Sequence, residues 1–144
     1  MENFSKNVAI EIKTVQASDG DKTSYVNKYS GKMFFKDDTF HIYYDETSDT
    51  LDKNIKTVVH ATYGKVEICR NGTYSTRFVY ESGKVYKTVY KMPYGEMPMV
   101  IKPSRVLTAL DENGGKICLD YRMSLAGQDF ENNVVITIQG EEHD

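Results

Sequence analysis

The sequence predicts an all-β protein: an antiparallel up-and-down β-barrel of about 8–10 strands, formed by residues 1–144 as a single domain. Two observations predict this fold. Apolar and polar side chains alternate with a period of two along most of the chain, as in strands with one buried and one wetted face. Short turn sequences rich in Gly, Asn and Asp separate these runs at hairpin spacing.

The alternation assigns a face to each side chain. Its clearest example lies in residues 117–125, where every second residue is large and apolar. We expect these residues to point into the barrel and their chain neighbours to point out. The inward set of this and the other runs is Val8, Ile10, Ile12, Phe40, Ile42, Tyr44, Ile55, Thr57, Val59, Ala61, Val66, Ile68, Tyr74, Thr76, Phe78, Tyr80, Ile117, Leu119, Tyr121, Met123, Leu125, Phe130, Val134, Ile136 and Ile138.

The connections between the runs predict how the strands are ordered. Asp19-Gly20, Asn71-Gly72 and Ala126-Gly127 are short and supply the positive φ that tight hairpin turns need. The polar stretch 45–54 is longer and is predicted to be a loop. Short sequential links favour an up-and-down meander over a Greek key, and closure into a barrel removes exposed strand edges.

Composition excludes several classes of partner. The net charge is −3 and the Lys and Arg residues are scattered, which argues against a nucleic-acid-binding protein. No apolar run reaches membrane-spanning length, and residues 1–6 contain no signal-like stretch, so we expect a cytoplasmic protein with no membrane partner. Cys69 and Cys118 are isolated, and we expect reduced thiols rather than a disulfide or a metal site.

Two motifs resemble a known family. Residues 77–83 follow the pattern Arg-Phe-x-x-x-x-Gly, and residues 93–99 follow Pro-Tyr-Gly-x-x-Pro-Met. Together with the strands at 10–14, 29–33 and 134–138, they resemble the YwiB-like group of small bacterial proteins along nearly the whole chain. The resemblance implies a calycin-type, lipocalin-like barrel in a bacterial cytosol and a domain of unknown function. A ligand cavity follows from it only by analogy with lipocalins.

Arg77 is the first candidate ligand-binding residue. A guanidinium on a barrel strand that faced inward would hold a carboxylate or phosphate through two hydrogen bonds. The alternation of Phe78 and Tyr80, however, places Arg77 on the opposite face. The alternative is therefore an outward Arg77 that pairs with Glu67 or Glu81.

The tract around Tyr94 and Gly95 supplies further candidates. It could form the barrel rim, with Tyr94 over the mouth and Gly95 at a positive φ; the alternative is a corner explained by turn chemistry alone. Tyr90, Met97 and Tyr121 complete the candidate ligand-binding set. Methionine side chains accept varied apolar ligands, but they more commonly fill gaps in a packed core.

No catalytic, metal or cofactor site is predicted. His41 and His60 lie on strand faces opposite the apolar set, and a metal site would need both to converge with a carboxylate. We expect them to be surface or rim imidazoles. The chain has no Gly-x-Ser-x-Gly motif and no phosphate-binding glycine loop, so an enzyme is the least favoured class.

Two function hypotheses remain from the sequence. The first is a binding module that takes a small, partly apolar molecule in the barrel interior or mouth. The second is a structural or protein-interaction module with a solid core, which acts through its surface or an edge and could form a homodimer. The inward side chains separate the two hypotheses, because they either line a void or fill the barrel axis.

Overall fold

The computed structural model describes residues 2–46, 55–72 and 75–141, and its regular structure in these ranges consists of β-strands. The described residues contain no helix that is long and apolar enough to cross a membrane. The ten strands, within the predicted number, are β1 (Phe4–Ser18), β2 (Asp21–Lys36), β3 (Thr39–Glu46), β4 (Ile55–Ala61), β5 (Lys65–Asn71), β6 (Ser75–Glu81), β7 (Tyr86–Met92), β8 (Gly95–Asp111), β9 (Gly114–Leu125) and β10 (Gln128–Gly140).

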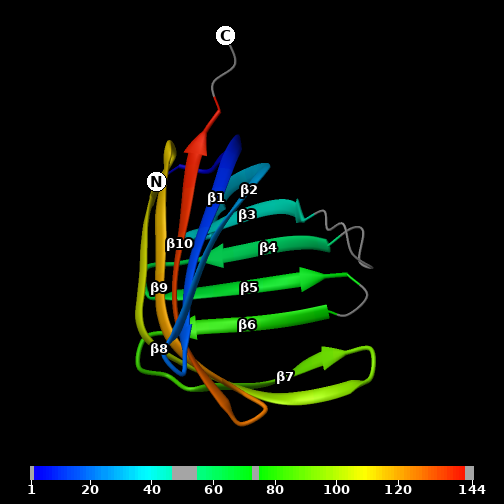
Figure 1. The fold of residues 1–144 in the computed structure, drawn as a ribbon. Helices are drawn as coiled ribbons and strands as arrows, with labels where there is room; N and C mark the ends of the chain where they lie inside the picture. The colour runs from blue at the N-terminus through cyan, green and yellow to red at the C-terminus, as the bar shows by residue number, and fades with distance from the viewer. Residues whose placement is uncertain (1, 47–54, 73–74, 142–144) are drawn as a thin grey trace.

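The strands form one antiparallel sheet that curls into a nearly closed barrel. Its order is β6-β5-β4-β3-β2-β1-β10-β9-β8-β7, so nearly every strand pairs with its neighbours in the chain. Figure 1 shows β3 to β6 crossing the direction of β1, β2, β8, β9 and β10 at a steep angle. The predicted up-and-down barrel is confirmed.

Closure differs from the expectation at one place. The two ends of the sheet, β6 and β7, are not paired with each other. The barrel is held together there by isolated contacts: Gly83 N donates to Pro103 O at 3.0 Å, and the Tyr86 hydroxyl donates to Arg77 O at 2.9 Å. The connection between β6 and β7 passes beside β8, to which Gly83 is hydrogen-bonded. The outer edges of β6 and β7 have no neighbouring strand, so each keeps unpaired backbone groups. We call this unpaired line between β6 and β7 the seam.

The hairpin turns have the predicted chemistry. Between β1 and β2, Asp19 and Gly20 have φ angles of 50° and 83°. Asp37 and Asp38, between β2 and β3, also both have positive φ angles. Two consecutive residues of positive φ match the twist of the strands they join, and Gly, Asp and Asn tolerate that conformation best. The loop predicted at 45–54 lies mostly outside the described residues, although Asp45 and Glu46 belong to β3.

The barrel interior changes character along its length. On β4, Ala61 and Val59 are fully buried, and Thr57 is 1% exposed. Towards the Ala61 end of β4 the inner face is filled by apolar side chains, which pack into one cluster, and Thr57 lies nearer the other end, opposite Tyr44. The opposite end, where β3, β5 and β7 finish, carries aromatic and polar side chains, some buried, such as Tyr44 at 5% exposure, and others open to solvent. We call this open end the mouth.

Substitutions on the inner and outer faces of β9 should have unequal effects on stability. Leu119 is 1% exposed, whereas Lys116 on the outer face of the same strand is exposed. We expect Leu119→Asn to lower the free energy of unfolding by about 3 kcal/mol or more, because it removes apolar packing and buries an amide. Lys116→Asn should stay within about 0.5 kcal/mol of the parent. Urea unfolding of both variants tests this, and equal losses would contradict the assigned faces.

Candidate ligand site at the barrel mouth

Arg70 is the central side chain of the mouth. It lies on β5, two residues after Ile68 and four after Val66, and therefore on the inner face. Its Nη2 atom lies 3.4 Å from Oε1 of Glu46 at the end of β3. The Arg70 side chain is 46% exposed and that of Glu46 is 15% exposed. The chain thus places a guanidinium inside the barrel, where solvent can still reach it.

Four tyrosines lie near enough to this guanidinium to interact with it electrostatically. Tyr29 and Tyr44 stack with their ring centroids 4.8 Å apart, and the rings of Tyr80 and Tyr121 lie 4.9 Å apart. Burial raises the pKa of the Tyr44, Tyr80 and Tyr121 hydroxyls. They are therefore neutral near pH 7 and act as hydrogen-bond donors and acceptors rather than as bases.

The electrostatics of the mouth favour the charged form of Arg70. Desolvation by itself would lower the pKa of Arg70, but its pKa is raised, and the neighbouring Glu46 carboxylate is the largest cause. A fixed positive charge therefore persists at every physiological pH. An anion that entered the mouth would meet this charge in surroundings less polar than water.

A recess of about 140 Å³ opens beside Arg70. Cavities of about 150 Å³ accept a single benzene ring, so the recess is the size of one small ring. Its lining combines apolar, aromatic and charged residues, namely Ile55, Arg70, Gly72, Thr76, Phe78, Tyr90 and Lys91. Most of these residues lie at or next to strand ends, whereas Phe78 is in the middle of β6. The remainder of the interior is filled by the apolar cluster.

Three of the sequence-predicted candidates lie on the inner face of the sheet, although Tyr90 is 37% exposed. Tyr90 lines the recess, and Met97 is its direct partner in the β7–β8 ladder. Tyr121 lies on the inner face of β9 against Tyr80. The structure therefore groups Tyr90 and Met97 on the β7–β8 hairpin that forms one side of the mouth, and sets Tyr121 deeper in the barrel.

The other three candidates do not line the recess. Arg77 is on the outer face, where its Nη2 donates to Glu67 Oε1 at 2.8 Å, which is the outward alternative. Tyr94 is 84% exposed at the tip of the β7–β8 hairpin, so its ring does not cover the mouth. Gly95 has a φ of 147° and serves the turn.

Sequence reasoning missed Arg70, although a signal for it was present. The alternation of Val66 and Ile68 extends by two residues to Arg70, which places it inward. The turn sequence Asn71-Gly72 follows Arg70 directly, so Arg70 can be taken for part of the turn rather than for the last inward residue of the strand. Polar residues at the ends of inward runs are the positions where a barrel mouth carries its chemistry.

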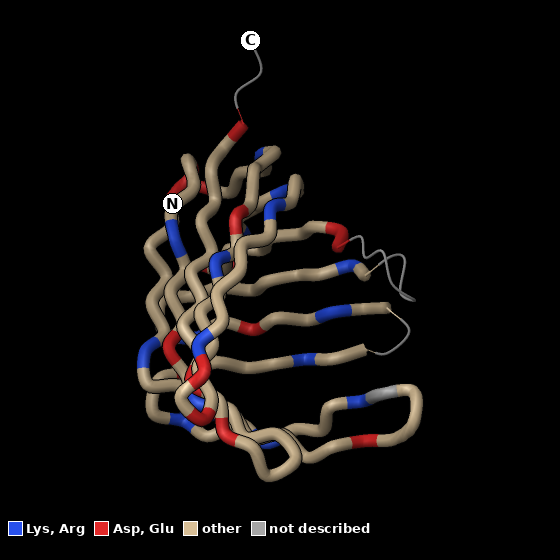
Figure 2. Tube along the Cα trace, in the orientation of Figure 1, with Lys and Arg blue, Asp and Glu red and all other residues tan. Residues whose placement is uncertain are grey.

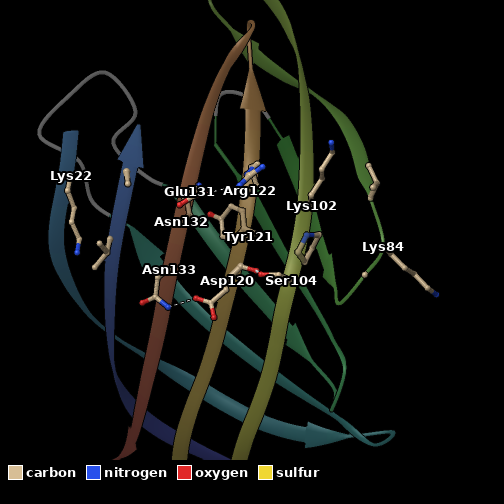
Figure 3. Close-up of a pocket in the computed structure, with 15 residues that line it drawn as sticks. Lys22, Lys84, Lys102, Ser104, Asp120, Tyr121, Arg122, Glu131, Asn132 and Asn133 are labelled. Carbon is tan, nitrogen blue, oxygen red and sulfur yellow. Dashed lines mark hydrogen bonds and ion pairs between the residues drawn. The ribbon is translucent and has the colours of Figure 1, made fainter. Parts of the chain in front are cut away.

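A second, wider hollow of about 800 Å³ lies on the outside of the barrel (Figure 3). It runs over the outer faces of β1, β8, β9 and β10. Its charged and polar groups are largely engaged with one another: Arg122 donates to Glu131 at 2.9 Å, and Asn133 donates to Asp120. The lining also includes the candidate residue Tyr121 and Asn132, whose buried Nδ2 has no hydrogen-bond partner among the described residues. We place the candidate site at the mouth because a guanidinium lies on the inner face of the barrel there.

Charges are mixed over the rest of the surface. Figure 2 shows Lys and Arg interspersed with Asp and Glu along most strands, without a face of one sign. Several pairs are close enough for ion pairing, including Lys65 with Glu67 at 3.4 Å and Lys84 with Glu81 at 3.0 Å. Exposed pairs of this kind contribute little to stability.

The fold and the mouth define a small antiparallel β-barrel with an arginine among interior tyrosines. The chain belongs to the family described as Domain of unknown function (DUF1934), whose model matches residues 10–137. It is 29% identical over 139 residues to the Uncharacterized beta-barrel protein YwiB of Bacillus subtilis (strain 168), covering 94% of this chain and 95% of that protein. The family expected from the two motifs is thereby confirmed.

A solved structure supports the same architecture. The crystal structure of ywiB protein from Bacillus subtilis superposes with a TM-score of 0.86 and 24% sequence identity. The match covers 96% of this chain and 94% of that chain. This likeness establishes the fold of the whole barrel, including the strands that form the mouth.

One buried hydroxyl beside Arg70 gives a direct test of the site. Thr57 lies opposite both Tyr44 and Arg70 in the ladders, and its Oγ1 has no hydrogen-bond partner among the described residues. Thr57→Val should therefore raise the free energy of unfolding by about 1 kcal/mol, because it removes an unpaired polar atom without changing the volume. Chemical denaturation measures the change.

Thr14→Val is the matched control for this substitution. Thr14 is also buried on the inner face, at 8% exposure, but its hydroxyl is not among the buried unpaired atoms. We expect no gain in stability from it. A loss of stability in Thr57→Val equal to that in Thr14→Val would show that the Thr57 hydroxyl is hydrogen-bonded in solution.

Proposed function

We propose that this protein is a binding module that takes a small organic anion with an apolar portion in the mouth of its barrel. The observation that carries the proposal is Arg70: a charged guanidinium on the inner face, among tyrosines and beside a recess the size of one ring. Charged groups rarely face a barrel interior unless they are paired or bind a ligand.

The contacts of Arg70 leave room for such a ligand. The guanidinium has five N–H donors in a planar fork. In the described part of the chain its ion-pair partner is Glu46, and a single N–O distance of 3.4 Å is longer than a good charge-assisted hydrogen bond. A carboxylate or phosphate that entered the mouth could therefore use the remaining donors. Its apolar part would occupy the recess against Phe78 and Ile55.

The chemistry of the mouth supports binding rather than catalysis. The tyrosine hydroxyls around Arg70 have raised pKa values, which makes them poor bases. Cys69 and Cys118 pair across the ladders with outer-face residues and lie away from the recess. A lipocalin-like mode of action, in which a barrel carries a ligand without changing it, fits these groups and needs no cofactor.

The surface charges and the two cysteines support a small-molecule partner and a cytoplasmic location. Mixed charges without a basic face support a small-molecule partner rather than nucleic acid. Two free cysteines, both partly buried and unpaired with each other, support a reducing, cytoplasmic setting.

Two arginines on adjacent strands allow a matched test of the site. Arg70 faces inward and Arg77 faces outward, so Arg70→Met and Arg77→Met remove the same group from opposite faces. We expect binding of benzoate, measured by NMR titration, to weaken about tenfold or more in Arg70→Met, because a charge-assisted hydrogen bond is lost. Binding should be unchanged in Arg77→Met.

The neutral analogue benzamide separates charge from shape. It should bind more weakly than benzoate to the parent chain, and Arg70→Met should reduce this difference. Equal weakening by Arg70→Met and Arg77→Met, or no binding of either probe, would contradict the proposed site. Native mass spectrometry of the chain purified gently from its own host would then identify any retained ligand by its excess mass.

A second candidate function is self-association through the seam. The free edge of β7 and its flanks expose several apolar side chains: Val85 at 54%, Val89 at 42% and Tyr94 at 84%. Edge strands that carry exposed apolar residues are the usual sites of strand-to-strand pairing between chains. A homodimer formed along β7 would satisfy the backbone groups that the seam leaves unpaired.

Self-association predicts a concentration-dependent mass that depends on Val89. We expect Val89→Lys to shift sedimentation equilibrium towards monomer, because a charge on the edge opposes pairing. Tyr43→Lys is the control, since Tyr43 is 40% exposed but lies on β3 with ladder partners on both sides, Lys32 of β2 and Val58 of β4. A parent chain that is monomeric at every concentration would exclude this second candidate.

A further inference from the structure

The outer face of the barrel brings two histidines together. His41 on β3 and His60 on β4 are direct partners in the antiparallel ladder, so their side chains leave the sheet on the same face. Their Nδ1 atoms lie 2.7 Å apart, and the rings meet edge to face with centroids 4.9 Å apart. Both imidazoles are partly buried. This contact is on the opposite side of the sheet from the mouth and is independent of the proposed ligand site.

The positions of the rings are set by their neighbours. The ring of His41 stacks on Phe34 with centroids 4.8 Å apart, and Phe34 in turn stacks on Tyr43 at 5.2 Å. On the other side, Glu67 of β5 is the direct ladder partner of His60. Its carboxylate is itself held by Arg77 at 2.8 Å. The two imidazoles are therefore held between an aromatic stack and a fixed carboxylate.

Two nitrogen atoms this close must share one hydrogen. At 2.7 Å, one Nδ1 carries a proton and donates it to the lone pair of the other. A metal ion can take the place of that proton if both rings adopt the tautomer with hydrogen on Nε2. The donor ring then moves its proton from Nδ1 to Nε2, so a neutral pair releases no proton.

We propose that His41 and His60 form an open two-histidine site for a divalent transition-metal ion, with water completing the coordination. Imidazole nitrogens suit Zn²⁺, Cu²⁺ and Ni²⁺. Two Zn–N bonds of about 2.0–2.1 Å at a tetrahedral angle place the nitrogens about 3.3 Å apart. The pair therefore has to open by about 0.6 Å from its 2.7 Å separation.

The site is open because its protein ligands are two. Within the described ranges, no group of three or more His, Cys, Asp or Glu side chains is placed to hold a metal ion. Glu67 does not complete such a group: it is the ladder partner of His60, and its carboxylate pairs with Arg77 at 2.8 Å and Lys65 at 3.4 Å. We therefore expect modest affinity and positions on the ion that remain accessible to solvent.

Calorimetric titration of the purified full chain with Zn²⁺ tests the site, and the chain supplies its own control. It contains three histidines, and the third, His143, lies outside the described residues. We expect one equivalent of Zn²⁺ to bind, and His41→Asn and His60→Asn each to weaken binding more than about tenfold. His143→Asn should leave the affinity unchanged. Glu67→Gln should weaken binding by about tenfold at most, since it is not a ligand.

A second readout guards against loss of folding. Cu²⁺ bound to the parent chain should show electron paramagnetic resonance couplings to two imidazole nitrogens, and His143→Asn should retain them. Circular dichroism should show that His41→Asn and His60→Asn keep the parent fold. Absence of Zn²⁺ binding by the parent chain, or weakening by His143→Asn equal to that of the other two variants, would overturn the proposal.

Discussion

The pairing of β1 with both β2 and β10 is the constraint on which the rest of the barrel depends. β1 runs beside β2 from Phe4 to Ser18 and beside β10 from Val8 to Ala17, so its backbone is hydrogen-bonded on both sides along most of its length. This arrangement joins the first and last strands of the chain at the centre of the sheet. Because the two halves of the sheet are joined there, the free edges fall in mid-sequence, at β6 and β7.

That constraint also determines where the chemistry lies. With β1 and β10 at the centre, the strands β3 to β6 curl over the apolar cluster and bring their far ends to the mouth (Figure 1). Apolar side chains fill the packed end, where burial provides most of the stability. The mouth keeps the polar residues that such packing would exclude. Arg70 is tolerated inside the barrel because Glu46 pairs with it and solvent reaches it.

The alternation of the sequence predicts most of this fold. It assigns Leu119, Ile136 and Val59 to the inner face, and all are buried. The turn chemistry at Asp19-Gly20 likewise predicts the positive φ values that the hairpin shows. These features depend on neighbours in the chain, so a single sequence is enough to find them. The family resemblance adds the barrel itself, which alternation alone leaves open to a sandwich.

The sites are harder to predict because they depend on register between strands. The inward position of Arg70 follows from Val66 and Ile68, but a turn directly after it hides the extension of β5. The contact of His41 with His60 depends on how β3 pairs with β4. A short turn of known type allows the register of a hairpin to be predicted from sequence. A long connection joins β3 and β4, so their register cannot be predicted in this way. Contacts between side chains across such a ladder can therefore be identified only from the structure.

The position of the seam has a consequence for the order of the chain. Val8 lies opposite Gly140, so the two ends of the polypeptide are adjacent in the sheet. A circular permutant that linked these ends and began at β7 would run β7, β8, β9, β10, β1 and onward to β6, with every neighbouring pair of strands consecutive. The natural chain differs from that simple meander in two connections. It has no link between β10 and β1, which are adjacent in the sheet, and it has a link between β6 and β7, which are not paired. The connection at residues 82–85 is thus the one link that the sheet does not require.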